Sequence, residues 1–332
     1  MIAPPRRDAD NPFEKANGPA ENSRMQQPKT AGIKWIGADW GSSNLRVYGF
    51  DDADVLICEA RSDAGSGSLS SAQFEPALIE LIGEWLQPDQ TYQVIICGMS
   101  GAREGWAEAG YSHVPCAPLA PGFTYAKTLD PRLDIRLISG LAQANPADVM
   151  RGEETQIAGF LALHPKFDGV LCLPGTHTKW AHISAGEVVS FQTVMTGDLF
   201  AAISEQTVLR HSLKEDGSPQ DGAGFIAAVS DAIARPERLA ASLFTIRAEG
   251  LLNGLAAGQA RARLSGLLIG AELATTRAYW LGQNVALIGD AQLSARYDTA
   301  LRAQGALPTI VDAEEMTRAG LAAARTQWRA IK

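Results

Sequence analysis

Two short stretches of this 332-residue chain place polar side chains at a turn directly after an apolar run. The first is DWGSSNLR (39–46) and the second is LPGTHTKW (173–180). In each of them a glycine precedes a hydroxyl residue, so backbone N–H groups and short hydroxyls could bind phosphate oxygens. Neither stretch is a P-loop, because the chain contains no Gly-Lys dipeptide.

The two stretches align with each other, so that Gly41 falls on Gly175 and Ser42 on Thr176. A single Gly-Ser or Gly-Thr turn is more often structural, since glycine supplies positive φ values. Repetition at equivalent positions favours the functional interpretation and predicts a clamp that binds a polyphosphate from two sides. The residues of this predicted clamp are Gly41, Ser42, Ser43, Gly175, Thr176, Thr178 and Lys179.

Asp39 lies at the end of the first apolar run, whereas Leu173 occupies the matching place before the second turn. A carboxylate at this point could hold Mg²⁺ partly through water, which is a common mode for this strongly hydrated ion. Turn capping is the alternative role for such an aspartate. The second turn opposite favours the metal role, and one carboxylate would then serve the whole clamp.

The segments around both turns repeat in the same order. Three apolar strands, helices and further strands occur twice, which predicts an α/β protein of two related lobes facing each other across a cleft. Strands are expected at 33–40, 44–50, 54–61, 92–99 and 134–141, and again at 169–176, 177–183, 187–195, 284–290 and 307–312. Helices are expected at 70–86 and 151–164, within 198–281, and after each of the last two strands. The lobes are placed at 33–150 and 151–332, with the last helix packing back on the first lobe.

Composition excludes several classes of protein. The net charge of −8 argues against nucleic-acid binding, which needs a basic face. No apolar stretch approaches the roughly 20 residues that cross a bilayer. The four cysteines form no C-x-x-C pair, which favours a reducing, cytoplasmic location. Residues 1–32 are rich in Pro, Asn, Gln and charge, and we expect a disordered leader there.

The paired turns resemble the phosphate-1 and phosphate-2 motifs of the actin-like ATPase, hexokinase and Hsp70 superfamily. The stretch IGDAQLSARYDTALRAQG (288–305) is similar to the adenosine motif of that superfamily, with Gly289 after a buried strand. This resemblance implies two ribonuclease-H-like lobes of the actin and hexokinase type, each a mixed β-sheet with flanking helices, around an interlobe cleft. It also implies ATP as the nucleotide.

A closer resemblance is to the 2-dehydro-3-deoxygalactonokinase family. It rests on GADWGSSNLR, CGMSGAREGW, MRGEETQIAGFLA, LPGTHTKW, TVMTGDLF and GLLIGAEL, and it covers about residues 33 to 325. The combination of motifs is specific, although each alone is not. The resemblance implies ATP- and Mg²⁺-dependent phosphorylation of the C6 hydroxyl of 2-dehydro-3-deoxy-D-galactonate, in galactonate catabolism.

The catalytic base is implied by a further likeness. RGEETQIAG (151–159) resembles the GDQQAALFG helix that carries the catalytic aspartate of glycerol-kinase-like sugar kinases. The match gives Glu153 the base position, with Glu154 as second candidate and Asp198 of MTGDLF as third. Here glutamate replaces aspartate and the spacing to the glycine is one residue shorter. The alternative is that two acids in a first helical turn simply favour the helix dipole.

The sugar-acid site should offer a cation and several hydrogen-bonding groups. Arginine matches a carboxylate with two parallel hydrogen bonds, although its usual role is a solvated surface charge. The candidates that lie in or beside family-like motifs are Arg46, Arg103 and Arg151, with Ser43, Asn44, Ser100 and Trp106.

The sequence also bears on other functions. Ser100 lacks the G-x-S-x-G spacing of a nucleophilic serine. His177 and His182 are five residues apart on a predicted strand, which puts them on opposite faces and argues against a shared metal. A kinase for an epimeric acid such as 2-dehydro-3-deoxygluconate stays open, and so does a nucleotide-gated binding protein of the actin type. The oligomeric state, including a homodimer, stays open too.

Overall fold

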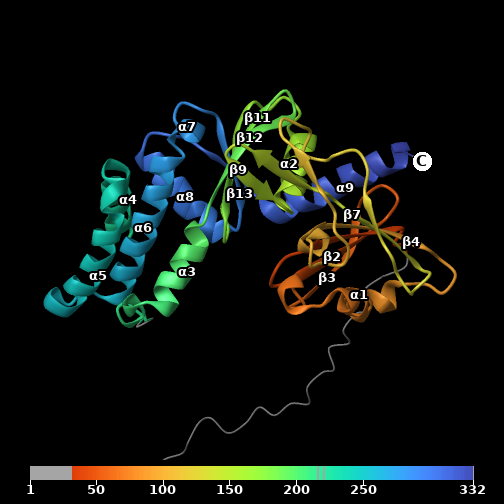
Figure 1. Cartoon of the computed structure of the whole chain (residues 1–332), viewed down its shortest axis with the longest axis horizontal. Coiled ribbons are helices and arrows are strands. Elements are labelled where there is room, and N and C mark those ends of the chain that lie inside the picture. The colour runs from red at the N-terminus through yellow and green to blue at the C-terminus, as the bar shows by residue number, and fades with distance from the viewer. Residues whose placement is uncertain (1–31, 215–216, 220, 332) are drawn as a thin grey trace, which may run out of the picture.

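Two mixed β-sheets with matching strand order form the framework of the structure (Figure 1). The computed structural model describes residues 32–214, 217–219 and 221–331. The first sheet has the order β3-β2-β1-β4-β7-β6 and the second the order β12-β11-β10-β13-β14. The first contains β1 (Trp35–Trp40), β2 (Leu45–Phe50), β3 (Leu56–Ser62), β4 (Tyr92–Gly98), β6 (Thr124–Ala126) and β7 (Leu133–Leu137). The second contains β10 (Gly169–Leu173), β11 (Thr178–Ser184), β12 (Glu187–Val194), β13 (Val285–Gly289) and β14 (Thr309–Asp312).

The strand directions repeat as well as the order. β1 runs antiparallel to β2 and parallel to β4, and β10 runs antiparallel to β11 and parallel to β13. The outer strands β3 and β12 are antiparallel to β2 and β11 in the same way. When the edge strand β6 is left out, the strands of each sheet, numbered in chain order, have the same order 3-2-1-4-5. The prediction of two ribonuclease-H-like lobes of the actin and hexokinase type is confirmed.

A small third sheet divides a segment that the sequence predicted as one strand. Residues 134–141 contribute to β7 in the first sheet and to β8 (Gly140–Ala144), which pairs with β5 (Tyr111–His113) and β9 (Ala147–Met150). The change of sheet comes at Gly140, where a side chain would overlap the Tyr111 ring and the Met150 carbonyl oxygen. Close backbone approach therefore decides the break, and hydrophobic periodicity does not show it.

Two long helices lie between the sheets. α2 (Glu153–Leu163) packs with the second sheet through Ile157 and Phe160. α9 (Ala313–Ile331) begins directly after β14 and packs on the first sheet through Leu321 and Trp328. In Figure 1, α9 extends from the neighbourhood of β13 toward the lobe of β4, with α2 beside it. The strand that leaves each glycine-hydroxyl turn contacts this helix pair, through Arg46 and Glu314 in one lobe and Lys179 and Glu153 in the other.

The remaining helices cover the outer faces. α1 (Phe74–Ile82) packs on the first sheet, opposite α9. A separate group of helices extends from the second lobe (Figure 1) and contains α3 (Thr196–Gln206), α4 (Gly222–Ala234), α5 (Leu239–Asn253) and α6 (Ala257–Thr275). α7 (Arg277–Trp280) and α8 (Ala291–Ala303) flank β13.

The side chains of β1 alternate between the two faces of the sheet, and this alternation puts Asp39 on the face that α9 covers. Ile36, Ala38 and Trp40 pack in the core with α1. Trp35 and Gly37 point the other way, where Gly37 adjoins Leu321 of α9. Asp39 has the same parity, so its carboxylate lies on the α9 side at the end of the strand.

Cysteine and hydropathy expectations can be checked on the described residues. The four cysteines in this part of the chain are all free thiols. Among the helices described, none is both long and apolar enough to cross a membrane. The leader predicted for residues 1–32 lies outside the described residues, apart from Gly32.

Candidate functional site

The first glycine-hydroxyl turn is exposed on one side and fixed by hydrogen bonds on the other. Ser42, Ser43 and Asn44 are exposed, and the Gly41 N–H donates to the Asn44 carbonyl oxygen at 2.9 Å. From behind, the Ser66 N–H donates to the Gly41 oxygen at 3.0 Å and the Gly67 N–H to the Ser42 oxygen at 2.9 Å. The turn is therefore preorganised by the 65–68 segment.

The second turn is built in the same way, with α3 as its support. Thr176 is exposed, and its carbonyl oxygen accepts from the Asp198 N–H at 3.0 Å. Gly197 fits against Gly175 so closely that a side chain there would overlap the Gly175 carbonyl oxygen. Thr178 differs, because it is fully buried and its Oγ1 lies 2.9 Å from the Tyr297 hydroxyl. Thr176, and not Thr178, presents its hydroxyl at the turn.

Two glycines with positive φ bring the acidic start of α2 beside the ends of β1 and β4. Gly98 has φ 89° and Gly152 has φ 106°. A Cβ on Gly152 would lie 3.4 Å from the Gly98 Cα, and one on Gly98 would meet the Trp40 carbonyl oxygen at 2.5 Å. Glycine is required at these positions because only it combines that conformation with so close an approach.

Glu153 contacts the strand that leaves the second turn. Its Oε1 lies 3.3 Å from Nζ of Lys179, and its Oε2 accepts from the Arg151 N–H at 3.1 Å. The Glu153 side chain is 25% exposed and that of Lys179 only 6%. Glu153 is thus a partly accessible carboxylate with a fixed orientation.

Glu154 is fully buried. Its carboxyl accepts from the Gly152 N–H at 2.6 Å and from Thr155 Oγ1 at 3.0 Å. Burial, reinforced by the charge of Glu153, raises the pKa of Glu154 to about 8. With that pKa, Glu154 is mostly protonated at pH 7. Its burial also keeps the carboxyl group from solvent.

Asp39 lies among charged neighbours from three elements. Arg46 Nη1 is 3.7 Å from its carboxylate and the Cys97 Sγ is 3.8 Å away. Burial raises the pKa of Asp39; Arg46 opposes that effect, and the charges of Glu153 and Glu314 add to it. A bound cation would therefore favour the charged form of Asp39.

This environment fits a hydrated Mg²⁺ better than a fully protein-ligated metal. Within the described part of the chain, no group of three His, Cys, Asp or Glu side chains is placed to hold a metal ion. Mg²⁺ usually takes one or two carboxylates and completes its shell with water and substrate phosphates. Asp39, beside two further acids, satisfies that requirement.

Arg46 is shared between two carboxylates. Besides Asp39, its Nε lies 3.7 Å from Oε1 of Glu314 in the first turn of α9. Glu314 is also paired with Arg61, at 2.8 Å. Arg46 stands directly opposite Asp39 in the β1–β2 register, which explains their proximity.

Arg151 lies against the segment Met99–Gly101, which follows β4 and contains Ser100. Arg151 Nη2 donates to the Ala109 carbonyl oxygen at 2.6 Å, and its guanidinium lies 4.4 Å from the centroid of the Tyr111 ring. A side chain on Gly101 would lie 2.9 Å from Arg151 Nη1. Arg151 Nε and Nη1 and the Ser100 Oγ are buried without a hydrogen-bond partner among the described residues.

The side chains of three other predicted site residues have different partners. Arg103 is 87% exposed and adjoins Glu108 at 3.7 Å. The ring of Trp106 packs on the rings of Trp40 and Phe74, with centroid distances of 6.1 Å in both cases. Trp106 therefore packs against the first core. Asp198 is 48% exposed, and its carboxylate lies 3.6 Å from His177 Nε2.

The predicted adenosine motif adjoins the second turn. Gly289 ends β13 beside Pro174, and Asp290 caps α8 by accepting from the N–H groups of Gln292 and Leu293. A cavity of ≈ 270 Å³ lies between α4, α6 and α8. Its lining residues are Asp221, Gly222, Phe225, Ala262, Ser265, Gln292, Ala295, Arg296 and Thr299.

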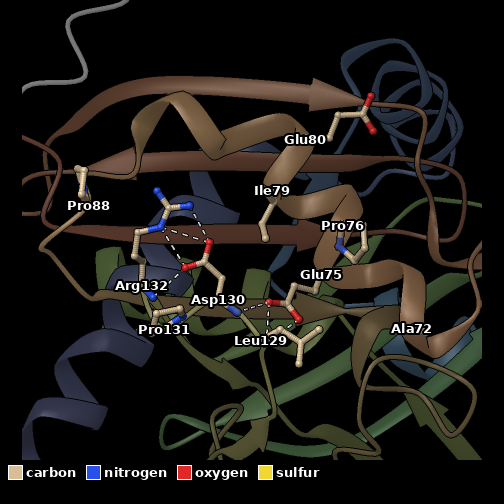
Figure 2. Close-up of a pocket in the computed structure, with 10 residues that line it drawn as sticks. All are labelled: Ala72, Glu75, Pro76, Ile79, Glu80, Pro88, Leu129, Asp130, Pro131 and Arg132. Atoms are coloured by element: carbon tan, nitrogen blue, oxygen red, sulfur yellow. Dashed lines mark hydrogen bonds and ion pairs between the residues drawn. The ribbon is translucent and has the colours of Figure 1, made fainter.

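A second cavity, of ≈ 1010 Å³, lies on the outer face of the first lobe (Figure 2). Figure 2 shows Glu75 of α1 accepting from the backbone of Leu129 and Asp130, and Arg132 paired with Asp130 at 2.7 Å. α1 and α9 cover opposite faces of the first sheet, so this cavity is separate from the Asp39 centre.

Sequence reasoning missed Glu314, Glu272 and Tyr297. Glu272 is fully enclosed and accepts hydrogen bonds from Trp180 and Tyr297. It is the only acid in the apolar stretch SGLLIGAELATT, which is a usable signal. The sequence does not single out Glu314 in this way, because it lies between other acids in DAEE (312–315).

Comparison with known proteins adds independent information. The model of the family described as 2-keto-3-deoxy-galactonokinase matches residues 39–324. A protein of Rhizobium meliloti (strain 1021) described as a probable 2-dehydro-3-deoxygalactonokinase is 40% identical over 304 residues, which cover 90% of this chain and 99% of that protein. The 2-dehydro-3-deoxygalactonokinase of Escherichia coli (strain K12) is 34% identical, over 87% of this chain and 96% of its own. A crystal structure from Sinorhizobium meliloti, provisionally described by the same activity, is 38% identical with a TM-score of 0.81, over 90% of this chain and 99% of that one.

Proposed function

This chain belongs to the 2-keto-3-deoxy-galactonokinase family, and we propose on that basis that it transfers the γ-phosphoryl group of ATP to the C6 hydroxyl of 2-dehydro-3-deoxy-D-galactonate. The product would be 2-dehydro-3-deoxy-6-phospho-D-galactonate. The reaction would be a step of galactonate catabolism. The family accounts for the kinase activity and the use of ATP. Mg²⁺, the precise acceptor and the residue roles are parts of the proposal.

The observation that carries the proposal is the meeting of three groups with different tasks. Lys179 comes from the strand after the second phosphate turn, Glu153 from the start of α2, and Asp39 from the end of β1. Lys179 contacts Glu153, and the charge of Glu153 acts on Asp39. Phosphoryl transfer needs a cation near phosphate, a carboxylate for a metal and a group that orients the acceptor hydroxyl.

Glu153 is the proposed base. In the transfer, the C6 oxygen forms a bond to the γ-phosphorus while the bond from that phosphorus to the β–γ bridging oxygen breaks and ADP leaves. The hydroxyl proton passes to a carboxylate oxygen of Glu153. Glu154 does not suit this task because it is buried and mostly protonated, and Asp198 lies at the exposed start of α3.

The nucleotide is proposed to span the two turns. Gly41, Ser42 and Ser43 on one side, and Gly175 and Thr176 on the other, would bind phosphate oxygens through N–H and hydroxyl groups. Bound Mg²⁺, held by Asp39, would neutralise phosphate charge. The adenosine end is assigned to the cavity between α4, α6 and α8, the helix that follows Gly289. Thr178 is given no phosphate contact because its hydroxyl is hydrogen-bonded to that of Tyr297.

Arg151 and Ser100 are the proposed partners of the sugar acid. Both have buried polar atoms without a hydrogen-bond partner in the part of the chain that the structure describes, and a carboxylate or hydroxyl of the substrate would supply one. Ser43 and Asn44 remain candidates at the exposed first turn. Arg46 serves Asp39 and Glu314 instead, while Arg103 and Trp106 are given no contact with the substrate.

We propose lobes at 33–150 and 151–332, a cytoplasmic location and closure of the lobes over the substrate. Leu141 and Met150 pack in the second core, so the β8–β9 hairpin forms a bridge between the lobes. A homodimer stays a prediction.

The function is tested with a coupled assay for ADP release, in which a panel of sugar acids is offered as the acceptor substrate. Turnover with 2-dehydro-3-deoxy-D-galactonate, and at least about 100-fold lower kcat/KM with the gluconate epimer, supports the proposal. Preference for the epimer would shift the substrate assignment. ATP hydrolysis stimulated only by a protein partner would refute the kinase and favour a nucleotide-gated binding protein.

A further inference from the structure

Glu272 of α6 is a buried carboxylate on which three donors from three other elements converge. Trp180 Nε1 on β11 donates to its Oε1 at 2.7 Å, and the Tyr297 hydroxyl on α8 donates to its Oε2 at 2.7 Å. Thr196 Oγ1, at the first residue of α3, donates to the same Oε2. Glu272 is 2% exposed, so these contacts replace its hydration.

Each donor belongs to a segment that supports the proposed nucleotide site. Trp180 follows Lys179 on β11. Thr196 begins α3, and two residues later the Asp198 N–H holds the Thr176 carbonyl oxygen. Tyr297 lies on the helix that begins after Gly289, and its hydroxyl also contacts Thr178 Oγ1 at 2.9 Å.

The chemistry of this cluster calls for a carboxylate. Three N–H or O–H donors point at two oxygens, and an ionised carboxylate only accepts. A glutamine would turn an NH₂ group toward some of these donors. A buried acid is costly unless it is well hydrogen-bonded, and here it is.

We propose that Glu272 is a positioning residue for the ATP site, which fixes the second phosphate turn, the start of α3 and the adenosine helix relative to one another. Because Glu272 is 2% exposed, it would act through these segments and would not contact the substrate. The inference rests on the proposed function, because it assumes that these segments bind the nucleotide.

The test compares Glu272→Gln and Tyr297→Phe with Trp280→Phe. Trp280 is a matched control because it is buried in the same core and its Nε1 donates to the Leu273 carbonyl oxygen at 2.8 Å, away from the turn. ADP affinity is measured by calorimetry, with KM for ATP and for the sugar acid from steady-state kinetics. Tyr297→Phe removes one hydroxyl only, so it keeps the test usable if Glu272→Gln does not fold.

The expected result is that Glu272→Gln and Tyr297→Phe each weaken ADP binding and raise KM for ATP about tenfold, since each loses a hydrogen bond to a charged group. KM for the sugar acid should change less than about twofold. Trp280→Phe should lower Tm at unchanged ADP affinity.

Unchanged ADP affinity in both folded test variants would overturn the inference and leave Glu272 a purely structural residue. A wild-type protein that binds ADP but shows no turnover with sugar acids would instead contradict the proposed acceptor chemistry. Because ADP binding is measured without any sugar acid, the two failures are distinguishable.

Discussion

Lys179 Nζ lies 3.3 Å from Glu153 Oε1, so the strand that leaves the second glycine-hydroxyl turn is joined to the first turn of α2. Lys179 is 5% exposed, and its ammonium has little solvent to replace this partner. The pair places the cation expected near phosphate beside the acid expected near the acceptor hydroxyl. Under the proposed roles, this one contact would link nucleotide binding to the chemical step.

Lys179→Met should lower kcat/KM for ATP at least about tenfold, because it removes the cation and the contact that orients Glu153. Steady-state kinetics with ATP as the varied substrate measures this. Lys166→Met, on an exposed loop before β10, is the matched control and should behave like wild type. Equal losses in both variants would show that the effect is one of net charge.

Asp39→Asn should raise the Mg²⁺ concentration that gives half-maximal activity by at least about tenfold, since it keeps the shape and removes the metal carboxylate. Calorimetric ADP binding with and without Mg²⁺ provides a readout besides activity. Mg²⁺ should strengthen ADP binding in the wild type and have a smaller effect in the variant. The same Mg²⁺ effect in both proteins would remove Asp39 from the metal site.

Glu154→Gln should change how stability depends on pH. The pKa of Glu154 is raised to about 8, so between its ordinary value of 4.5 and about 8 the folded state holds a proton that the unfolded chain has released. The contribution of Glu154 to the free energy of unfolding is complete below pH 4.5. It decreases by up to about 1.4 kcal/mol per pH unit as the pH rises from there to about 8.

Urea unfolding of both proteins at several pH values measures this difference. The free energy of unfolding of Glu154→Gln, minus that of the wild type, should increase from pH 5 to pH 8. Loss of a hydrogen bond in the variant adds a constant and leaves the slope intact. A flat difference would show that Glu154 is ionised in the fold.

Gly159→Ala should destabilise the protein by about 2 kcal/mol or more, because a Cβ there would overlap the Met316 carbonyl oxygen where α2 crosses α9. Gly320 makes the reciprocal approach to the Thr155 carbonyl oxygen. The control is Gly222→Ala at the start of α4, where a Cβ meets nothing within 4 Å. Urea unfolding should separate the two, and similar stabilities would contradict the close crossing.

The repeat of two α/β lobes could be predicted from sequence because apolar runs and glycine-hydroxyl turns recur in the same order along the chain. The lobe type was implied by the resemblance to the actin and hexokinase superfamily. Both glycine-hydroxyl turns were identified from the same recurrence. The break between β7 and β8 was not, since it depends on backbone contacts of Gly140 with residues distant in sequence.

Thr178 shows where sequence reasoning had a usable signal and did not apply it. It begins β11 and has the same parity as Trp180, which is buried. The period of two therefore places its hydroxyl on a core face, while Lys179 points the other way. For Arg46 no such signal exists, because its second carboxylate, Glu314, lies 268 positions later in the chain, the difference between 314 and 46.

Trp106 and Arg103 were placed by motif alone. Their segment, after CGMSGA, is irregular, and periodicity gives no direction for side chains in irregular backbone. The structure packs Trp106 against Phe74 of α1 and exposes Arg103. Arg151 in the same predicted set instead lies beside Gly101, the residue that follows the buried Ser100.

The most direct test of Glu153 as the base is ADP release by Glu153→Gln with saturating ATP and 2-dehydro-3-deoxy-D-galactonate, beside ADP affinity from calorimetry. Glu205→Gln on α3, which is exposed, is the control. We predict a loss of about 10²- to 10⁴-fold in kcat for Glu153→Gln at unchanged ADP affinity, as for a lost general base. A near-wild-type kcat in Glu153→Gln, with the loss found in Asp198→Asn instead, would contradict the assignment.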